Sequence, residues 1–265
     1  CDSSYDSRNT WNGLSDFGRK VVREMNKIGM MIDVSHCTDK TFYDILKITN
    51  KPLVATHSSP RKFTPNFERN MSDNMIKDLA SNNGLIMLNF GSGFISEQSN
   101  KSFGDINSKV EKYKIENNLK DSDKKILKYK DDLINTVKPF ASINDFVDTI
   151  DHVKELVGID HIGLGSDFEG LGNTLPYDLK DASTYPNILY KLLEREYSQI
   201  EIKKICSDNL FRVWNANLQN RQIWYFLQEL PYHLTSEGQL GSLVVDHTSN
   251  ILHLPVLQSY LANYH

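Results

Sequence analysis

Short apolar runs alternate with amphipathic segments through most of the chain. Four runs are rich in Val, Ile, Leu and Met and predict buried strands, over residues 30–36, 52–57, 85–90 and 162–167. Between these runs, apolar residues recur at helical spacing behind Ser, Thr or Asp residues that can cap a helix. This order of helices and strands predicts right-handed βαβ units, and therefore an α/β fold with a parallel sheet.

Two stretches depart from this alternation. Residues 99–138 are dense in Lys, Asp, Glu and Asn and predict one or two solvated helices inserted between strands. Amphipathic helices are expected again at 143–157, 187–197 and 201–215. Beyond Lys204 no lysine occurs, and four of the eight histidines lie in the last stretch. We therefore divide the chain into a domain over 1–218 and a tail over 219–265, in which no catalytic motif is evident.

Composition narrows the class of protein. The 265 residues are 39% hydrophobic, enough to bury a core, and the net charge of -4 gives no indication of nucleic acid as a partner. Three scattered cysteines are too few for a disulfide framework or a four-cysteine zinc site. No apolar run approaches the roughly 20 residues of a membrane span. The chain begins at Cys1 without a signal-peptide pattern, so localisation cannot be inferred from it.

Side chains with metal-binding or acid-base chemistry stand at the ends of three predicted strands. His36, His57 and Asp167 each close such a run. In parallel α/β barrels, the carboxyl ends of the strands are where active sites are built. Imidazole is a good zinc ligand, and a carboxylate beside a metal-bound water can act as its general base. Alternatively, each histidine caps a loop and Asp167 begins a turn, and the spacing alone leaves both interpretations open.

Residues near these three positions add further candidates. Arg61 and Arg69 lie in the loop after the second strand, where either could hold a substrate carboxylate or remain a loop cation. Asp33 is expected to point inward and orient a metal ligand. Glu169 could compete with Asp167, although strand alternation leaves it in the following loop. Cys37 is interpreted as a packing residue. Two further histidines are interpreted as structural, His152 and His161.

Several of these motifs resemble the membrane (renal) dipeptidase family of zinc metallo-dipeptidases. The resemblance extends over about residues 5–217, in the family's order. It is carried by Ile-Asp-Val-Ser-His ending at His36, Ala-Thr-His-Ser-Ser-Pro-Arg over 55–61, Glu-Arg-Asn-Met-Ser-Asp over 68–73, Asp-His-Val-Lys-Glu-Leu-Val-Gly over 151–158 and His-Ile-Gly-Leu-Gly-Ser-Asp-Phe-Glu-Gly over 161–170. The segment 207–213 also resembles the family's closing helix.

The resemblance implies a (β/α)8 barrel that binds two zinc ions and hydrolyses dipeptides with metal-bound hydroxide. It implies that His36 and His57 are ligands of one zinc, and that Arg69 holds the substrate's C-terminal carboxylate. Asp167 would be the acid-base group and would also meet the substrate amine. Family members commonly form dimers, so a homodimer is a possible assembly.

The resemblance also implies that part of the family's site is missing here. The early His-x-Asp pair, the bridging Glu and a further histidine have no counterpart in this sequence. We therefore expect a C-terminal fragment, with about four strands of the barrel and little activity of its own. Open sheet edges would favour association or aggregation. Two alternatives stay open: a non-catalytic remnant used as a binding module, and another barrel amidohydrolase, although a lysine bridging ligand and a His-x-His pair are not visible.

Overall fold

The computed structural model of the chain describes residues 1–6, 8–218, 244–245 and 252–253. The chain divides into two units, Cys1–Ile223 and Trp224–His265. In the second unit, β4 (Val244–Val245) pairs in antiparallel fashion with β5 (Leu252–His253). The rest of the tail predicted over 219–265 lies outside the described residues. All candidate site residues belong to the first unit.

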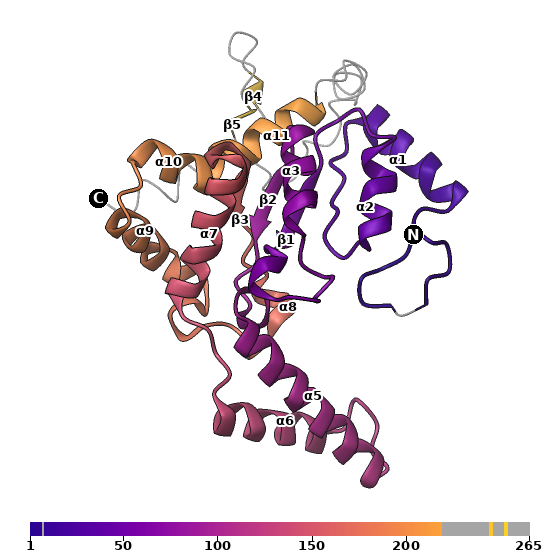
Figure 1. Cartoon of the computed structure of the whole chain (residues 1–265), viewed down its shortest axis with the longest axis vertical. Helices are drawn as coiled ribbons and strands as arrows, with labels where there is room; N and C mark the ends of the chain where they lie inside the picture. Colours follow the sequence, from indigo (N-terminus) through magenta and orange to yellow (C-terminus); the bar gives the residue numbers. More distant parts are fainter. Residues whose placement is uncertain (7, 219–243, 246–251, 254–265) are drawn as a thin grey trace, which may run out of the picture. The chain divides into compact units, whose positions relative to one another are not determined.

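A parallel sheet forms the centre of the first unit (Figure 1). Its strands are β1 (Val54–Ser58), β2 (Leu85–Leu88) and β3 (Ile162–Leu164), side by side in that order. Each corresponds to one of the predicted strands, and the predicted α/β fold with a parallel sheet is confirmed.

The prediction of a strand over 30–36 is wrong, because this segment does not form a regular strand. The segment contacts β1 through a single parallel bridge between Asp33 and Val54. The amide of Val34 donates to the Val54 carbonyl at 2.8 Å, and the amide of Val54 donates to the Ile32 carbonyl at 3.1 Å. The Asp33 carboxylate then accepts the amide of Ser35 at 2.9 Å, which turns the chain out of the ladder. The Asp33 side chain thus competes with strand pairing for the Ser35 amide, and apolar periodicity does not reveal such a competitor.

Each helix beside the sheet begins directly after a Ser or Thr residue that caps it. They are α1 (Asp16–Ile28), α2 (Asp39–Leu46), α3 (Asp73–Ser81) and α7 (Ile143–Val157). Ser15, Thr38, Ser72 and Ser142 each accept an amide hydrogen from the first turn of the helix that follows. Such a cap stabilises a helix by about 1 kcal/mol. The caps fix where each helix starts, and therefore where each preceding loop must end.

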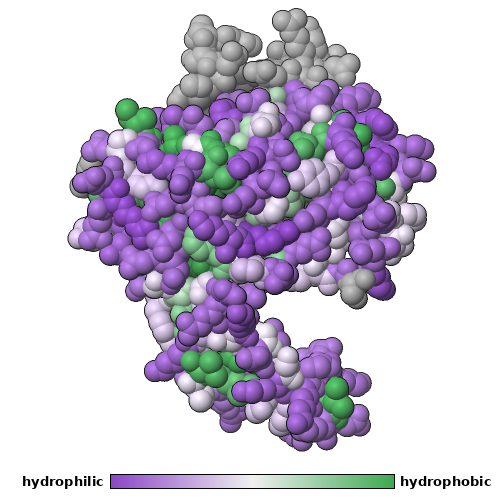
Figure 2. All heavy atoms as spheres, in the orientation of Figure 1, coloured by the Kyte–Doolittle hydropathy of each residue, from purple (hydrophilic) through white to green (hydrophobic). Residues whose placement is uncertain are grey.

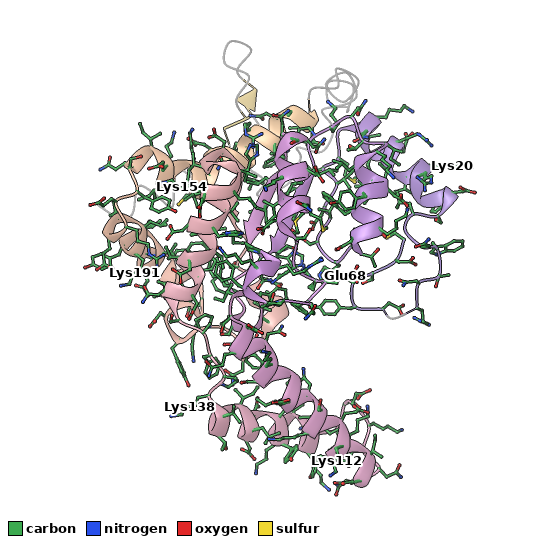
Figure 3. The ribbon with its side chains drawn as sticks, in the orientation of Figure 1. Lys20, Glu68, Lys112, Lys138, Lys154 and Lys191 are labelled. Atoms are coloured by element: carbon green, nitrogen blue, oxygen red, sulfur yellow. The ribbon has the colours of Figure 1, made fainter. Side chains whose placement is uncertain are left out.

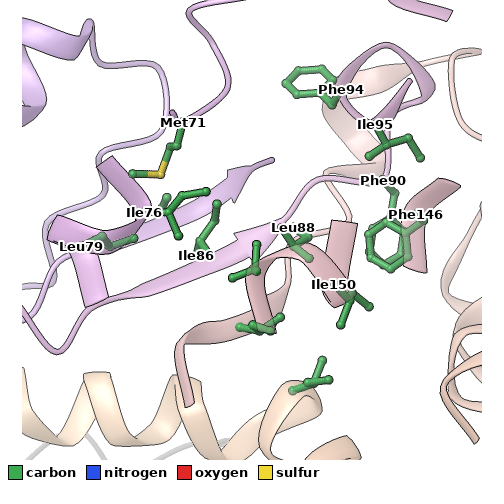
Figure 4. Close-up of a cluster of buried hydrophobic side chains, with 14 of the residues drawn as sticks. Met71, Ile76, Leu79, Ile86, Leu88, Phe90, Phe94, Ile95, Phe146 and Ile150 are labelled. Carbon is green, nitrogen blue, oxygen red and sulfur yellow. The ribbon is translucent and has the colours of Figure 1, made fainter. Parts of the chain in front are cut away.

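The main hydrophobic core lies between one face of the sheet and helices α3 and α7 (Figure 4). Ile86 and Leu88 of β2 meet Ile76 of α3 and Phe146 of α7 there, and all four are fully buried. The rings of Phe146 and Phe90 pack edge to face with centroids 4.5 Å apart. Truncating a buried phenylalanine of this kind to alanine costs about 3–5 kcal/mol. This core holds β2 and β3 rigidly beneath the loops that follow them.

The opposite face of the sheet packs against the last described helix, α11 (Asn209–Leu218). Val213 of α11 contacts Val54 and Leu85 in a small buried cluster. The Asn209 amide group donates to the carbonyls of Ile159 and Ile162 at 2.8 Å each. The single helix predicted over 201–215 is in fact α10 (Gln199–Lys203), a π-helical turn (Lys204–Asp208) and α11. The widened turn occurs where the chain approaches β3.

The polar stretch over 99–138 forms a helical hairpin, as predicted. It consists of α5 (Glu97–Glu116) and α6 (Lys124–Val137). The two helices share their own small core of Phe103, Ile106 and Ile134. Their outer surfaces carry many charged side chains, including the labelled Lys112 (Figure 3).

Short elements complete the first unit. Two are brief α-helices, α4 (Ser92–Ile95) and α8 (Phe168–Leu171), and one is a full helix, α9 (Tyr185–Glu194). The 3₁₀ turns span Arg61–Phe63, Ile159–His161, Tyr177–Leu179 and Ala182–Thr184. The face of the molecule seen in Figure 2 is mostly hydrophilic where it is coloured, with apolar residues in small groups. None of the described helices is both long and apolar enough to cross a membrane.

Candidate active site

The two candidate zinc ligands meet at the carboxyl end of the sheet. His57 lies in β1, and His36 lies in the turn after the Asp33 bridge. Their Nε2 atoms are 2.9 Å apart, and their ring centroids are separated by 4.9 Å. The predicted convergence of the two imidazoles is therefore found. Asp167, after β3, is close enough for its charge to act on the pKa of both imidazoles.

The strand that carries His57 is interrupted by a β-bulge. Val54 and Ala55 pair with Leu85 and Ile86 in register, but Ser58 pairs with Leu88, so β1 carries one extra residue there. Strict alternation would send the side chains of Thr56 and His57 to opposite faces. Instead the Thr56 hydroxyl lies 2.7 Å from Nδ1 of His57. Bulges are frequent beside active sites because they redirect a side chain in this way.

Two of the candidate residues hold left-handed backbone conformations. The φ angles are 69° at His36 and 55° at Asp167. For residues other than glycine this conformation costs about 1–2 kcal/mol. At His36 the carbonyl accepts the amide of Ser4 at 2.8 Å, which helps to hold the turn. Backbone strain of this kind is concentrated at functional sites.

Burial lowers the pKa of both His36 and His57, and the nearby positive charge of Arg69 lowers the pKa of each further. The imidazoles are therefore biased toward the neutral form, which is the form that binds a metal. Burial also raises the pKa of the neighbouring Cys37 thiol to about 11. A thiol that stays protonated is a poor ligand, in agreement with the interpretation of Cys37 as a packing residue.

Arg69 is a buried cation with no carboxylate partner in the part of the chain that the structure describes. It is 3% exposed, and its guanidinium donates to the Ser58 hydroxyl and to the His57 carbonyl, both at 2.7 Å. Its Nε has no hydrogen-bond partner among the described residues, and no described Asp or Glu forms an ion pair with it. Burial lowers the pKa of Arg69. The fully buried Asn70 beside it holds the loop by accepting the amide of Ser59 at 3.1 Å.

Arg61, the other candidate, is already engaged. It binds both carboxylate oxygens of Asp39, at 2.8 and 2.5 Å, and donates from Nε to the Asn70 carbonyl at 2.8 Å. These bonds tie the loop to the start of α2. Glu68 reinforces the same junction by accepting the Asp39 amide at 3.0 Å (Figure 3). Arg61 therefore has a structural role, and Arg69 is the arginine available to a ligand.

Asp167 is held by a residue that sequence reasoning missed. The side-chain amide of Asn89, which follows β2, donates to Oδ2 of Asp167 at 3.0 Å. Asn89 is fully buried, and its other side-chain atom accepts the amide of Gly91 at 2.7 Å. Glu169, the competing carboxylate, is exposed on α8. A single Asn after a strand carries no distinctive signal, so only the fold identifies it.

Tyr5 is a second missed residue. Its ring lies 5.5 Å from the ring of His36, centroid to centroid, and the charge of Arg69 acts on its hydroxyl, whose pKa burial raises. It comes from the turn-rich N-terminal segment, which showed no motif. By contrast, the two histidines interpreted as structural are bound elsewhere: His152 contacts Asp73 and Lys62, and His161 contacts the Gly84 carbonyl.

The donor set fits part of a zinc site. Two nitrogen ligands of one tetrahedral zinc lie about 3.3 Å apart when each bond is about 2.0–2.1 Å. The 2.9 Å between the Nε2 atoms of His36 and His57 is close to that spacing. Among the described residues, however, no three His, Cys, Asp or Glu side chains are grouped to hold a metal. These two histidines therefore fit two of the ligands of a zinc ion rather than a complete set.

Comparison with known proteins decides the family. The sequence profile described as membrane dipeptidase (peptidase family M19) matches residues 1–224. The chain belongs to this family. An uncharacterised dipeptidase of Schizosaccharomyces pombe is 32% identical over 203 residues, which are 76% of this chain and 39% of that protein. The membrane dipeptidase resemblance read from the motifs is thus confirmed.

Solved structures agree with the family assignment. The probable dipeptidase PvdM of Pseudomonas aeruginosa has a TM-score of 0.68 and 25% identity, over 83% of this chain and 60% of that one. A dipeptidase described as a metallopeptidase of family M19 has a TM-score of 0.60 and 25% identity, over 79% and 49% of the two chains. This member of the membrane dipeptidase family spans about two fifths of the curated relative's length.

Proposed function

We propose that the chain carries the C-terminal half of a zinc-dependent dipeptidase site on residues 1–218, with 219–265 as a separate tail. In this proposal His36 and His57 bind one zinc, Arg69 binds the substrate's C-terminal carboxylate, and Asp167 is the acid-base group. The observation that carries it is the buried Arg69 guanidinium, 3% exposed and without a carboxylate partner among the described residues, beside two converging imidazoles.

Arg69 would contribute binding affinity for the substrate and would select substrates of dipeptide length. A buried cation without a counter-ion is unfavourable, so a ligand carboxylate that reaches it gains a charge-assisted pair. The guanidinium is already fixed by Ser58 and the His57 carbonyl, so little side-chain entropy is lost on binding. One residue spans about 3.3–3.6 Å. A C-terminal carboxylate held at Arg69 therefore places the peptide bond one residue away, beside the two histidines, as hydrolysis of a dipeptide requires.

Asp167 would move the protons of the reaction. Bound zinc supplies a Lewis acid that polarises the scissile carbonyl and activates water. The Asp167 carboxylate can take up a proton as water attacks and return it to the departing amine. Asn89 holds Oδ2 at 3.0 Å, which leaves Oδ1 as the oxygen that can exchange this proton. The same carboxylate, when ionised, can bind the substrate's ammonium group.

The complete reaction would need ligands that the described residues do not group together. We infer that they come from a preceding half of the barrel, which would also close the sheet. The isolated chain is then expected to bind zinc weakly and to hydrolyse dipeptides little or not at all. A homodimer is a further possible assembly of the complete protein. A non-catalytic binding module is the second candidate function, and the two-histidine donor set is the observation that favours it.

Zinc binding to the purified chain tests the proposal. Titration calorimetry should give one site that is lost in His36→Ala and His57→Ala and retained in His161→Ala, whose imidazole bonds a carbonyl away from the site. A dipeptide added to the zinc-loaded chain should bind more weakly in Arg69→Gln than in Arg61→Gln. Zinc binding that survives loss of both site histidines would contradict the metal assignment. Zinc binding with no effect of Arg69 on dipeptides would favour the binding module.

A further inference from the structure

A chain of hydrogen bonds leads from Asp33 to the ring of His57. Oδ2 of Asp33 lies 2.5 Å from the Thr56 hydroxyl, and that hydroxyl lies 2.7 Å from Nδ1 of His57. Oδ1 of Asp33 accepts the backbone amides of Ser35 and Thr56, at 2.9 and 3.0 Å. None of these contacts follows from the motif spacing, and the contact between Thr56 and His57 lies within the bulged part of β1.

The directions of these bonds follow from counting protons. The Thr56 hydroxyl has one hydrogen and lies between two acceptors. Two backbone amides already donate to Asp33, which favours its ionised, acceptor-only form. The hydroxyl hydrogen therefore goes to Asp33, at the shorter of the two contacts. The Thr56 oxygen is left as an acceptor, so the hydrogen in its contact with His57 must sit on Nδ1 of the imidazole.

We propose that Thr56, oriented by Asp33, is a positioning residue that fixes His57 as the Nδ1–H tautomer. Nε2 of His57 then carries a lone pair directed at the place where Nε2 of His36 also converges. This inference rests on the proposed zinc-binding function, because it assigns the residue that prepares one ligand. Ligating histidines are generally oriented by such an outer partner, whose loss weakens metal binding about 10–100-fold.

The arrangement also assigns opposite tautomers to the two histidines in the metal-free chain. The Nε2 atoms are 2.9 Å apart, a hydrogen-bonding distance that needs one proton between them. Nε2 of His57 has none in this scheme, so His36 carries its proton on Nε2 and donates it. The pair is held together without metal, at the cost of a proton shift on His36 when zinc binds. His57 is then the preformed ligand and His36 the adaptable one.

Nitrogen NMR of the metal-free, full-length chain tests the inference directly. The ¹⁵N shifts of a protonated and an unprotonated ring nitrogen differ widely, so they report the tautomer without any activity. We expect Nδ1–H for His57 and Nε2–H for His36 in the wild type. Thr56→Val, which is nearly the same size, should remove the Nδ1–H preference of His57, and Thr56→Ser should restore it. Thr136→Val on α6 is the matched control, because its hydroxyl donates to the Asp132 carbonyl within its own helix.

Zinc titration of the same proteins separates this inference from the proposed function. Thr56→Val should weaken zinc binding about 10–100-fold, with Thr56→Ser and Thr136→Val near wild type. An Nε2–H tautomer of His57 in the wild type, or one unchanged by Thr56→Val, would overturn the role of Thr56 even if zinc binds. A correct tautomer pattern in a chain that binds no zinc would support the hydrogen-bond chain and refute the zinc function.

Discussion

Gly170→Ala is a sharp test of how Asp167 is held. Gly170 lies in α8, three residues after Asp167, and it does not adopt a left-handed φ, so the methyl group itself is the perturbation. A Cβ at this position would lie 2.3 Å from Oδ1 of Asp167 and 3.0 Å from its Cγ. No ordinary contact is so short. The Asp167 carboxylate must therefore move, or α8 must shift.

The structure indicates the size of the effect. Ordinary Cβ contacts begin near 3.4 Å, so the carboxylate is displaced by about 1 Å. Displacement breaks its bond to Asn89, and a hydrogen bond to a charged group contributes about 1.5–3 kcal/mol. Alanine regains about 0.5–1 kcal/mol over glycine within a helix, so the net loss of unfolding free energy is roughly 1–2 kcal/mol. In a complete enzyme, a shift of about 1 Å at a reacting group lowers turnover about 100-fold.

Urea unfolding of four proteins measures this effect: wild type, Gly170→Ala, Asp167→Gly and the double variant. Asp167→Gly removes the carboxylate and relieves its φ of 55°. Without the carboxylate, the added methyl has no clash with it, so Gly170→Ala should become neutral or stabilising by about 0.5 kcal/mol. Gly104→Ala on α5 is the matched control, because no atom of the described residues lies within 4 Å of its added Cβ. It should be stabilising in every background.

An equal loss from Gly170→Ala with and without the Asp167 carboxylate would refute this reasoning. The loss would then come from α8 itself, and Gly170 would say nothing about the position of the acid-base group. The same result would weaken the proposal that Asn89 fixes Asp167, because a bond that can be displaced at no measurable cost does not fix a side chain.

Two further predictions concern titration. Burial raises the pKa of Cys37 to about 11, so its thiolate is about one part in a thousand of the residue at pH 8. Iodoacetamide should therefore alkylate Cys37 more slowly than the exposed Cys1 and Cys206. Equal alkylation rates in peptide mass spectrometry would contradict this. The bond from Lys154, 2.7 Å long, lowers the pKa of Glu201 from 4.5 to about 2. Glu201→Gln should therefore reduce stability by less than about 1 kcal/mol at pH 7. That difference should shrink as pH falls from 4.5 toward 2, and a difference in urea unfolding that grows on acidification would contradict the assignment.

The sequence predicts the elements whose signals are local. Ser15 and Gly29 mark both ends of α1, because a cap and a left-handed terminal glycine depend on a few neighbouring residues. The strand at 30–36 fails as a prediction because the Asp33 side chain competes with the ladder for the Ser35 amide. Apolar periodicity reports which residues are buried, and it does not report where a polar side chain captures the backbone.

The candidate site divides in the same way. Motifs in the sequence identify His36, His57, Arg69 and Asp167. Their supports are not recognisable. Thr56 contacts His57 within the bulged part of β1, and Asn89 meets Asp167 from 78 positions away. The carbonyl of Thr56 approaches so closely that a Cβ at Gly165 would lie 2.2 Å from it. That glycine was visible as a motif residue, but the approach that requires it is a property of three strands together.

The α5–α6 hairpin makes the chain tolerant of engineering between β2 and β3. Asn89 and Asp167 stand at the ends of these strands, and the pairing of β2 with β3 fixes their separation whatever the length of chain between them. The entropy of closing a loop rises only with the logarithm of its length, so each doubling costs about 0.6 kcal/mol. The hairpin tip between α5 and α6 is therefore a suitable insertion site for a fluorescent reporter or an affinity tag. A label inserted there would mark the protein without entering the site.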